Sequence, residues 1–218
     1  MTQPLPPSAS VAQVVEGAKL FAPSAIRNVD ALCEMLLQHA PETGHALEIA
    51  SGTGQHVTAF AAALPRLLWQ PTEIDAARRA SIDAYVSDAG LRNVAPAAEL
   101  NAAQPGWSAR VPAKELILLA NLLHLITATE AQTIIQEAAL ALSSAGTLIL
   151  YGPFKRDGQL TSDGDIQFDA ELRAADPAIG YKDTNDITAW LADAGLMQIA
   201  PHPMPANNIA FIARKPAS

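Results

Sequence analysis

The residues best suited to chemistry lie between positions 46 and 56, where a short strand pattern runs into a glycine-rich turn. Leu47, Glu48 and Ile49 form a run of strand length, and Gly52 and Gly54 follow it closely. A helical pattern of apolar residues then begins at position 57. A strand, a tight glycine turn and a helix present backbone N–H groups and a helix N-terminus to a ligand. In an α/β sheet such a ligand lies at the carboxyl ends of the strands, beside the topological switch point.

The spacing of the glycines distinguishes between ligands. A dinucleotide fingerprint requires a third glycine at the position that Val57 occupies here, which disfavours a NAD-linked oxidoreductase. Glu48 followed by Ser51-Gly52-Thr53-Gly54 instead resembles the first motif of the class I S-adenosylmethionine (SAM) methyltransferases. This resemblance implies that SAM is the cofactor. A structural turn without any ligand is the alternative.

Two carboxylates at the end of the next strand compete for the ribose of such a cofactor. The run 67–75 predicts a second strand with an acidic end. Glu73 lies about 20 residues after the glycine turn, the offset at which an acidic side chain accepts ribose hydroxyls. Asp75 directly precedes a helical pattern and is better placed as its N-cap. We therefore favour Glu73 over Asp75 for the ribose.

Later strands supply further candidates. Residues 94–101 predict a third strand that ends at Asn101, where class I methyltransferases often place an aspartate that binds the adenine amino group. An asparagine side chain retains an acceptor oxygen for that amine. The apolar run 115–120 predicts a central strand buried on both faces, followed by Asn121 and His124. These two residues are expected at the carboxyl edge of the sheet.

Among the five histidines, His124 is the best general-base candidate, because an imidazole titrates near neutrality. A purely structural role for His124 stays open. Tyr151, at the end of a fifth strand predicted over 147–151, is a second choice for the base. Arg27 opens a helix predicted over 26–41 and is either a clamp for a carboxylate or a solvated helix-start arginine.

Composition limits the substrate class. The chain of 218 residues is acidic, with a formal net charge of −8, and its 14 Lys and Arg residues are scattered along the sequence. A nucleic-acid binder usually has a basic stripe, so we expect a small-molecule methyl acceptor and no nucleic acid. One cysteine, Cys33, excludes an internal disulfide framework and a cysteine-rich zinc site. With no signal peptide or membrane span recognisable, we expect a cytoplasmic protein without membrane contact.

The remaining patterns complete a three-layer α/β fold. The segment 1–22, which is Pro-rich over residues 1–10 and carries a short helix predicted at 11–18, is expected to be partly disordered or to act as a lid. Residues 23–218 form a single domain. The acidic stretch 161–171 lacks the ligand spacing of a calcium loop and predicts a solvated lid. Runs at 197–204 and 209–213 predict an antiparallel hairpin. We expect seven strands, mostly parallel, closed by this hairpin.

Six segments together resemble one narrower group, the methyltransferase-like 26 family of short methyltransferase-like proteins. Its most specific segment here is Tyr-Gly-Pro-Phe-Lys-Arg-Asp-Gly, and the others are Ala-Pro-Ser-Ala-Ile-Arg-Asn, Leu-Glu-Ile-Ala-Ser-Gly-Thr-Gly-Gln-His, Trp-Gln-Pro-Thr-Glu-Ile-Asp, Ala-Asn-Leu-Leu-His and Met-Pro-Ala-Asn-Asn. This chain departs from the family at three positions. It has Ile26 where the family usually has Glu, and it has Glu73 and Asn101 where the family usually has Asp.

The resemblance implies a Rossmann-like class I sheet and a methyltransferase that acts by in-line transfer to oxygen or nitrogen. It places the cofactor against Arg27, Glu48, Ala50, Ser51, Gly52, Gly54, His56, Glu73, Ile74, Leu100, Asn101, Asn121, Leu122 and His124. No metal site is predicted, and the protein is expected to be a monomer or a homodimer. A SAM-binding protein without catalysis, serving as a sensor or partner subunit, is the alternative function.

Overall fold

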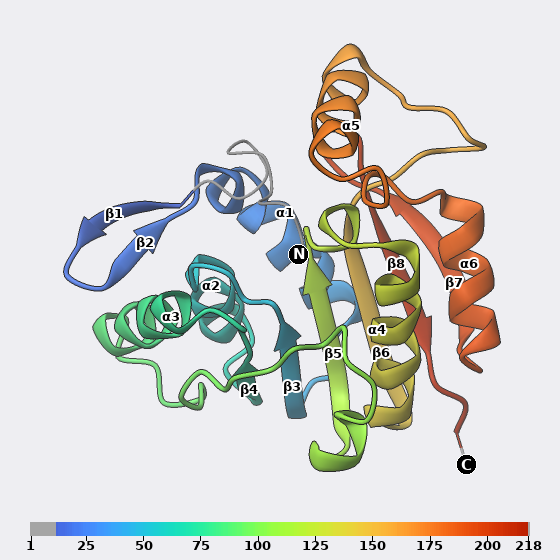
Figure 1. Cartoon of the computed structure of the whole chain (residues 1–218). Coiled ribbons are helices and arrows are strands. Elements are labelled where there is room, and N and C mark those ends of the chain that lie inside the picture. The colour runs from blue at the N-terminus through green and yellow to red at the C-terminus, as the bar shows by residue number, and fades with distance from the viewer. Residues whose placement is uncertain (1–11, 218) are drawn as a thin grey trace.

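The computed structural model describes residues 12–217, which form an α/β fold around one six-stranded sheet. The strands are β3 (Gly44–Ile49), β4 (Leu67–Pro71), β5 (Lys114–Ala120), β6 (Leu142–Pro153), β7 (Met197–Pro203) and β8 (Asn208–Arg214). They lie in the order β4-β3-β5-β6-β8-β7 (Figure 1). The strands from β3 to β6 pair in parallel, and β8 pairs antiparallel to both β6 and β7. The prediction of a mostly parallel sheet with an antiparallel hairpin at its end is confirmed.

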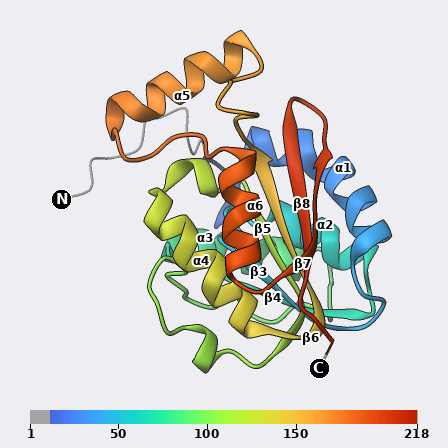
Figure 2. The same cartoon turned by 90° about the vertical axis from the view of Figure 1, so that its right-hand side faces the viewer.

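Helices cover both faces of the sheet. They are α1 (Pro23–His39), α2 (Gln55–Ala63), α3 (Ala76–Asp88), α4 (Ala128–Ala141), α5 (Asp163–Ala175) and α6 (Thr184–Asp193). Figure 2 shows α1 and α2 on one face and α4 and α6 on the other, with α5 beyond the carboxyl ends of the strands. The central strand β5 is buried on both faces, as its continuous apolar sequence predicts.

The chain order creates a switch point at β3. The strand that follows β3 in the chain, β4, pairs on one side of it, and β5 pairs on the other side. Loops leaving β3 and β5 therefore separate at the carboxyl edge, where a ligand fits between them. The glycine turn follows β3 at this point, so the fold places it where the sequence predicted a binding site.

The expectation of a seven-stranded sheet is wrong. The segment predicted as the third strand pairs with β4 only through isolated parallel bridges, Trp69 to Val94 and Thr72 to Ala98. A continuous ladder needs a donor from β4 between these bridges, and Pro71 has no N–H to give. The pairing therefore stops after the Ala95 N–H bond to the Trp69 carbonyl. It resumes at the bridge between Thr72 and Ala98.

The predicted first helix is also wrong within the described residues. In its place lies a two-stranded antiparallel hairpin of β1 (Gln13–Glu16) and β2 (Lys19–Phe21), while Val11 lies outside the described residues. Val14 and Val15 are exposed, so their helical spacing does not reflect a buried face. Gly17 turns the chain with a positive φ of 57°.

Two local predictions need smaller corrections. The spacing of Thr129 and Gln132 predicts a capping box at the start of α4, but the structure forms this capping box from Thr127 and Glu130. The acidic stretch expected to be a solvated lid is the helix α5, which Ser162 caps and whose Asp169 is buried. Among residues 12–217, no helix is both long and apolar enough to cross a membrane.

Candidate active site at the carboxyl edge

The turn after β3 is fixed by positive φ angles and by backbone hydrogen bonds. Ala50 has a φ of 54° and Gly52 a φ of 61°. The Ser51 N–H bonds to the Thr72 carbonyl at 2.8 Å, which ties the turn to the end of β4. A Cβ on Gly52 would come within 4 Å only of the Arg78 side chain, so the space above this residue is open to a ligand.

Gly54 has a different role from Gly52. A Cβ on Gly54 would lie 2.6 Å from the Ile82 Cα, so only glycine lets α3 pack this closely against the turn. Neighbouring polar contacts reinforce this packing. The buried Ser81 hydroxyl of α3 donates to the Thr53 carbonyl at 2.8 Å and accepts the Leu20 N–H at 2.8 Å. The Ser81 hydroxyl therefore connects α3 to both the glycine turn and the hairpin strand β2.

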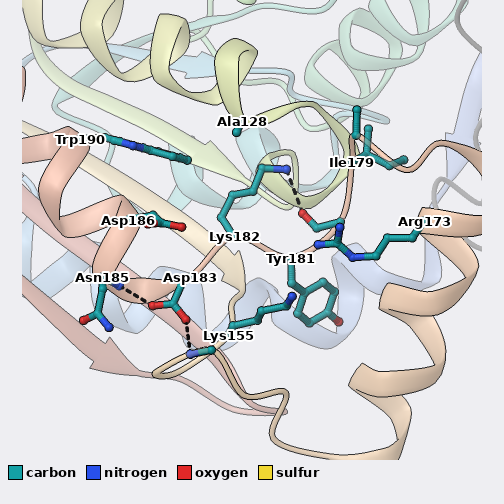
Figure 3. A pocket seen from close by; sticks show the side chains of 13 residues that line it. Ala128, Lys155, Arg173, Ile179, Tyr181, Lys182, Asp183, Asn185, Asp186 and Trp190 are labelled. Carbon is teal, nitrogen blue, oxygen red and sulfur yellow. Dashed lines mark hydrogen bonds between the residues drawn. The ribbon is translucent and has the colours of Figure 1, made fainter.

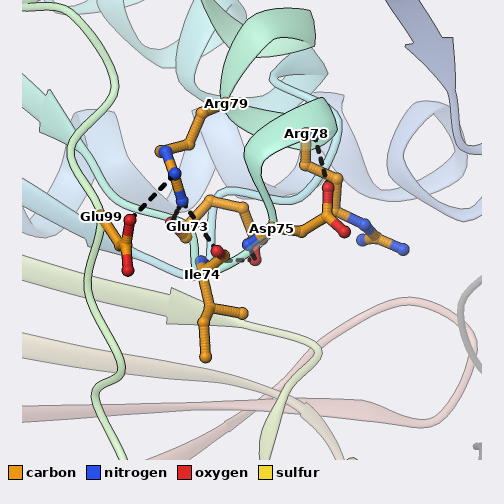
Figure 4. Close-up of polar contacts among 6 residues, drawn as sticks. All are labelled: Glu73, Ile74, Asp75, Arg78, Arg79 and Glu99. Atoms are coloured by element: carbon orange, nitrogen blue, oxygen red, sulfur yellow. Dashed lines mark hydrogen bonds and ion pairs between the residues drawn. The ribbon is translucent and has the colours of Figure 1, made fainter.

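Glu73 lies directly against the glycine turn. The Gly52 N–H donates to its Oε2 at 3.1 Å, and the N–H groups of Ile74 and Asp75 donate to its Oε1 at 2.8 and 3.2 Å. Three backbone donors thus fix the carboxylate of a residue that is 6% exposed, and Figure 4 shows Glu73 with Ile74 and Asp75. Asp75 instead accepts the Arg78 N–H and caps α3, as the sequence predicted. The structure thus brings Gly52 and Glu73 together on one side of the sheet edge.

Arg79 holds the loop that follows β4, and it was not among the residues predicted from the sequence. Its guanidinium donates to the carbonyl oxygens of Glu73 and Ile74 at 2.9 and 2.7 Å and pairs with Glu99 at 3.0 Å (Figure 4). This contact joins the end of β4 to the segment that carries Leu100. An arginine in a helix pattern gives no sequence signal for such a role, because its partners are backbone atoms.

Glu48 is buried at the end of β3 with part of its hydrogen-bonding capacity unused. It is 1% exposed, and its Oε2 has no hydrogen-bond partner within the described part of the chain. Burial raises the pKa of this carboxyl to about 7; the nearby Ser51 hydroxyl opposes the rise and the Glu73 carboxylate adds to it. A buried carboxyl of this kind gains a partner when a cationic group arrives.

A cavity of about 410 Å³ lies at the end of the segment that was predicted as the third strand, residues 94–101. Asn101, the residue predicted to hold the adenine, and Leu100, predicted to contact the cofactor, line it together with Trp107 and Arg110. The Asn101 Oδ1 accepts the Ala103 N–H at 3.2 Å, and its amide N–H groups have no partner in the described structure. Trp107 belongs to the core, since it is fully buried and donates to the Ala102 carbonyl.

The end of β5 carries the candidate base. Asn121 has a φ of 57°, which turns the chain sharply into Leu122 and a short 3₁₀ helix that contains His124. The His124 ring is 6% exposed and makes edge contacts with Phe168 and Tyr181. Burial, with a smaller effect from the nearby Lys182, lowers the pKa of His124 to about 3. The imidazole is therefore neutral at ordinary pH.

Three of the predicted residues are engaged elsewhere or stand apart. The His56 Nε2 contacts the Ala25 carbonyl at 3.1 Å, and burial lowers the pKa of this histidine to about 4, so its ring joins α2 to α1. Tyr151 is buried on the face that α1 covers, and burial raises its pKa to about 12, partly offset by the Asn208 side chain. Arg27 is exposed at the start of α1, without a partner in the described part of the chain.

A family model matches residues 19–215 of this chain, nearly all of the described structure. Its description is a protein of unknown function, DUF938. The chain belongs to the DUF938 family. The narrower methyltransferase-like 26 family is not shown by this match.

Solved structures share the fold of this DUF938 protein at low sequence identity. An O-methyltransferase family protein from Burkholderia thailandensis has a TM-score of 0.76 and 18% identity, over 89% of this chain and 57% of its own. PigF with SAH has a TM-score of 0.72 and 16% identity, covering 88% and 56%. Human N-acetylserotonin methyltransferase with SAM has a TM-score of 0.72 and 12% identity, covering 89% and 53%. The DUF938 chain thus spans little more than half the length of these neighbours, and the likeness shows a shared α/β fold.

Proposed function

We propose that this DUF938 protein is a SAM-dependent methyltransferase that transfers a methyl group to an oxygen or nitrogen of a small molecule. The observation that carries the proposal is the contact between the Gly52 N–H and the Glu73 carboxylate, at the switch point of the sheet. The shared fold with solved SAM-dependent methyltransferases supports it. The resemblance of the quoted segments to the methyltransferase-like 26 family is part of the same proposal.

The residues at this edge fit SAM. Glu73 is positioned to accept a ribose hydroxyl through its Oε2, which binds only the Gly52 N–H and has a further lone pair, whereas its Oε1 already accepts two backbone amides. The unpartnered Oε2 of Glu48 suits the ammonium of the methionine end, and Asn121 directly follows the end of the neighbouring strand β5. Leu100 and Asn101 would border the adenine. The sulfonium of bound SAM supplies an activated methyl group, and the protein mainly aligns the acceptor for in-line attack.

His124 is the proposed base for a hydroxyl acceptor. A low pKa does not prevent this role, because the O–H group becomes strongly acidic as the new C–O bond forms, and the neutral ring accepts its proton. We expect His124→Gln to reduce the methyl-transfer rate about 100-fold while changing SAM affinity much less. Labelled-methyl transfer and calorimetry measure the two quantities. Equal rates in the variant and the wild type would assign His124 a structural role.

Calorimetric titration with SAM tests the cofactor site. We expect the wild-type protein to bind SAM and Gly52→Val to lose binding, because the new side chain fills the open space above the turn. Valine is also strained at a positive φ, which affects stability. Gly90→Val is the matched control, since Gly90 has a φ of 63° and open surroundings at the end of α3. No heat with the wild type, or equal loss in both variants, would refute the site.

A further inference from the structure

A second cavity, of about 540 Å³, lies between the start of α4, the loop after β6 and the helices α5 and α6. Its size is typical of sites that bind small molecules. Three cationic side chains line it, Lys155, Arg173 and Lys182, together with the aromatic rings of Tyr181 and Trp190 (Figure 3). In a protein with a net charge of −8, such a gathering of cations is a specific local feature.

Lys182 is the most unusual of the three cations. Its side chain is buried, with 7% of the residue exposed, and its ammonium donates to the carbonyl oxygens of Ile126 and Gly180. No carboxylate among the described residues lies within ion-pair distance of it. Burial first, and then repulsion from Arg173 and Lys155, lowers the pKa of Lys182 to about 8, although Asp169 and Glu130 oppose these effects. A buried ammonium without an anionic partner is costly, and an anion in the cavity would relieve that cost.

The other two cations leave donors free. Lys155 makes no side-chain hydrogen bond or ion pair within the described part of the chain. Arg173 uses its Nε for the buried Asp169 at 2.8 Å, which leaves its two terminal nitrogens unengaged in the described contacts. Gly180 allows its loop to pack closely against Asp169, because a Cβ at this position would lie 2.7 Å from the Asp169 Oδ1. The cavity wall is therefore built around the cationic side chains.

The carboxylates around the cavity are mostly occupied by backbone donors. Asp183 accepts the Gly158 N–H at 2.6 Å and the Asn185 N–H at 2.9 Å, as the N-cap of α6 (Figure 3). Asp169 accepts the Tyr181 N–H in addition to its pair with Arg173. Glu130 belongs to the capping box of α4. Asp186 is exposed on α6. A ligand with its own negative charge can therefore meet donors that these carboxylates leave free.

The cavity is attached to the candidate active site. The Gly180 N–H donates to the His124 carbonyl at 3.0 Å, and the Tyr181 ring contacts the His124 ring with centroids 5.9 Å apart. The wall formed by residues 180–182 thus continues directly into the end of β5. A molecule bound against Lys155 and Trp190 would therefore lie across this wall from the segment that carries His124.

We infer that this cavity binds the methyl acceptor, and that the acceptor is a small anion whose carboxylate or phosphate contacts Lys155, Lys182 and Arg173. The inference rests on the proposed function for the identity of the ligand as an acceptor. The cationic lining of the cavity alone supports the anionic character of the ligand. A planar part of the same molecule would lie against Trp190.

The first test measures anion binding to the full chain without SAM. Benzoate and phenyl phosphate are the probes, with benzamide and phenol as neutral analogues, and the ¹⁵N–¹H indole signal of Trp190 reports binding. Trp69 and Trp107 are buried, so their signals serve as internal references. We expect both anions to shift the Trp190 signal and the neutral analogues to leave it unchanged. The stronger of the two anions identifies carboxylate or phosphate as the preferred group.

Variants make this test specific. Lys155→Met removes a side chain without partners and should weaken anion binding about tenfold, as expected for the loss of one charge-assisted hydrogen bond. Lys155→Arg should retain most of the affinity. Arg66→Met removes the same charge from the opposite edge of the sheet, where Arg66 pairs with Glu42, and should bind as the wild type does. Equal binding of neutral and anionic probes, or unchanged binding by Lys155→Met, would overturn the inference.

The second test addresses the acceptor. A small-molecule extract is first divided on an anion-exchange resin, and each fraction is then incubated with the protein and methyl-labelled SAM. We expect label to enter compounds of the retained fraction, with about tenfold less incorporation by Lys155→Met and none of this loss in Arg66→Met. Label only in the unretained fraction would overturn an anionic acceptor. Failure of SAM to bind would refute the proposed function instead, and the probe titration would still decide the anion site.

Discussion

The Glu73→Ala variant is expected to bind SAM about 100-fold more weakly than the wild type. The free lone pair of the Glu73 Oε2 would accept a ribose hydroxyl in a charge-assisted hydrogen bond of about 1.5–3 kcal/mol, and the upper part of that range corresponds to this factor. The effect is large because Glu73 is already fixed by three backbone amides and needs no ordering when a ligand arrives. Calorimetric titration of both proteins with SAM measures the ratio.

Asp75→Ala is the matched control for this prediction, because it removes a carboxylate two residues away in the same loop. Asp75 caps α3 through the Arg78 N–H, so its loss should lower the free energy of unfolding by about 1 kcal/mol and leave SAM affinity nearly unchanged. Urea unfolding of both variants separates stability from binding. If Asp75→Ala weakens SAM binding as much as Glu73→Ala does, the assignment of the ribose contact to Glu73 is wrong.

Glu48→Gln is expected to stabilise the protein above neutral pH. In the unfolded chain this carboxyl loses its proton near its ordinary pKa, whereas the folded protein retains it up to a pKa of about 7. The wild type therefore loses stability between these two values and carries the full penalty at pH 8. A shift of this size corresponds to a gain on the order of 3 kcal/mol for the glutamine variant at pH 8, and to almost none at pH 4.5. Urea unfolding at both pH values measures it.

Glu115→Gln provides a control with the opposite sign. Burial alone would raise the pKa of Glu115, but the hydrogen bond from the His45 N–H and related contacts outweigh it and lower the pKa. Removing that carboxylate should therefore reduce stability at pH 8 and not at low pH. If the Glu48→Gln variant is no more stable than the wild type at pH 8, burial does not raise the pKa of Glu48 in the folded protein.

The same residue predicts a signature of ligand binding. A cationic ligand group beside Glu48 favours the carboxylate, so binding SAM near pH 6 should release about one proton from the protein. Calorimetry in buffers of different ionisation enthalpy detects the release. Glu48→Gln should bind SAM weakly and without this proton. Stability and binding therefore move in opposite directions at this position.

The sequence was informative where a local pattern alone determines the structure. The apolar run of β3, the glycines after it and the N-cap at Asp75 were all predicted, because each depends on neighbours within a few residues. The capping box of α4 was placed two residues late. Thr127 and Thr129 both have a polar residue three positions on, and only the path of the chain out of β5 decides between them.

Other features depend on contacts that no local pattern contains. The predicted third strand does not form a continuous ladder, because Pro71 in β4 has no N–H to donate to the partner segment some 25 residues later in the chain. The hairpin at Val14 and Val15 was missed because their spacing matched a helix, although neither residue is buried. The cationic cavity joins Lys155 to Lys182 and Arg173 across three segments, so the separate residues gave no indication of a shared site.

The hydroxyl of Ser81 has a consequence for how the start of the chain relates to the site. This single group receives the Leu20 N–H of the hairpin and donates to the Thr53 carbonyl in the glycine turn. A parallel link runs through Gln55, whose Oε1 accepts both the Ala22 N–H and the Thr53 hydroxyl. A displacement of residues 20–22 would therefore be transmitted to the glycine turn, where we propose that the nucleoside binds. Changes near the N-terminus should accordingly alter ligand affinity as well as folding, even though the hairpin itself supplies none of the proposed cofactor contacts.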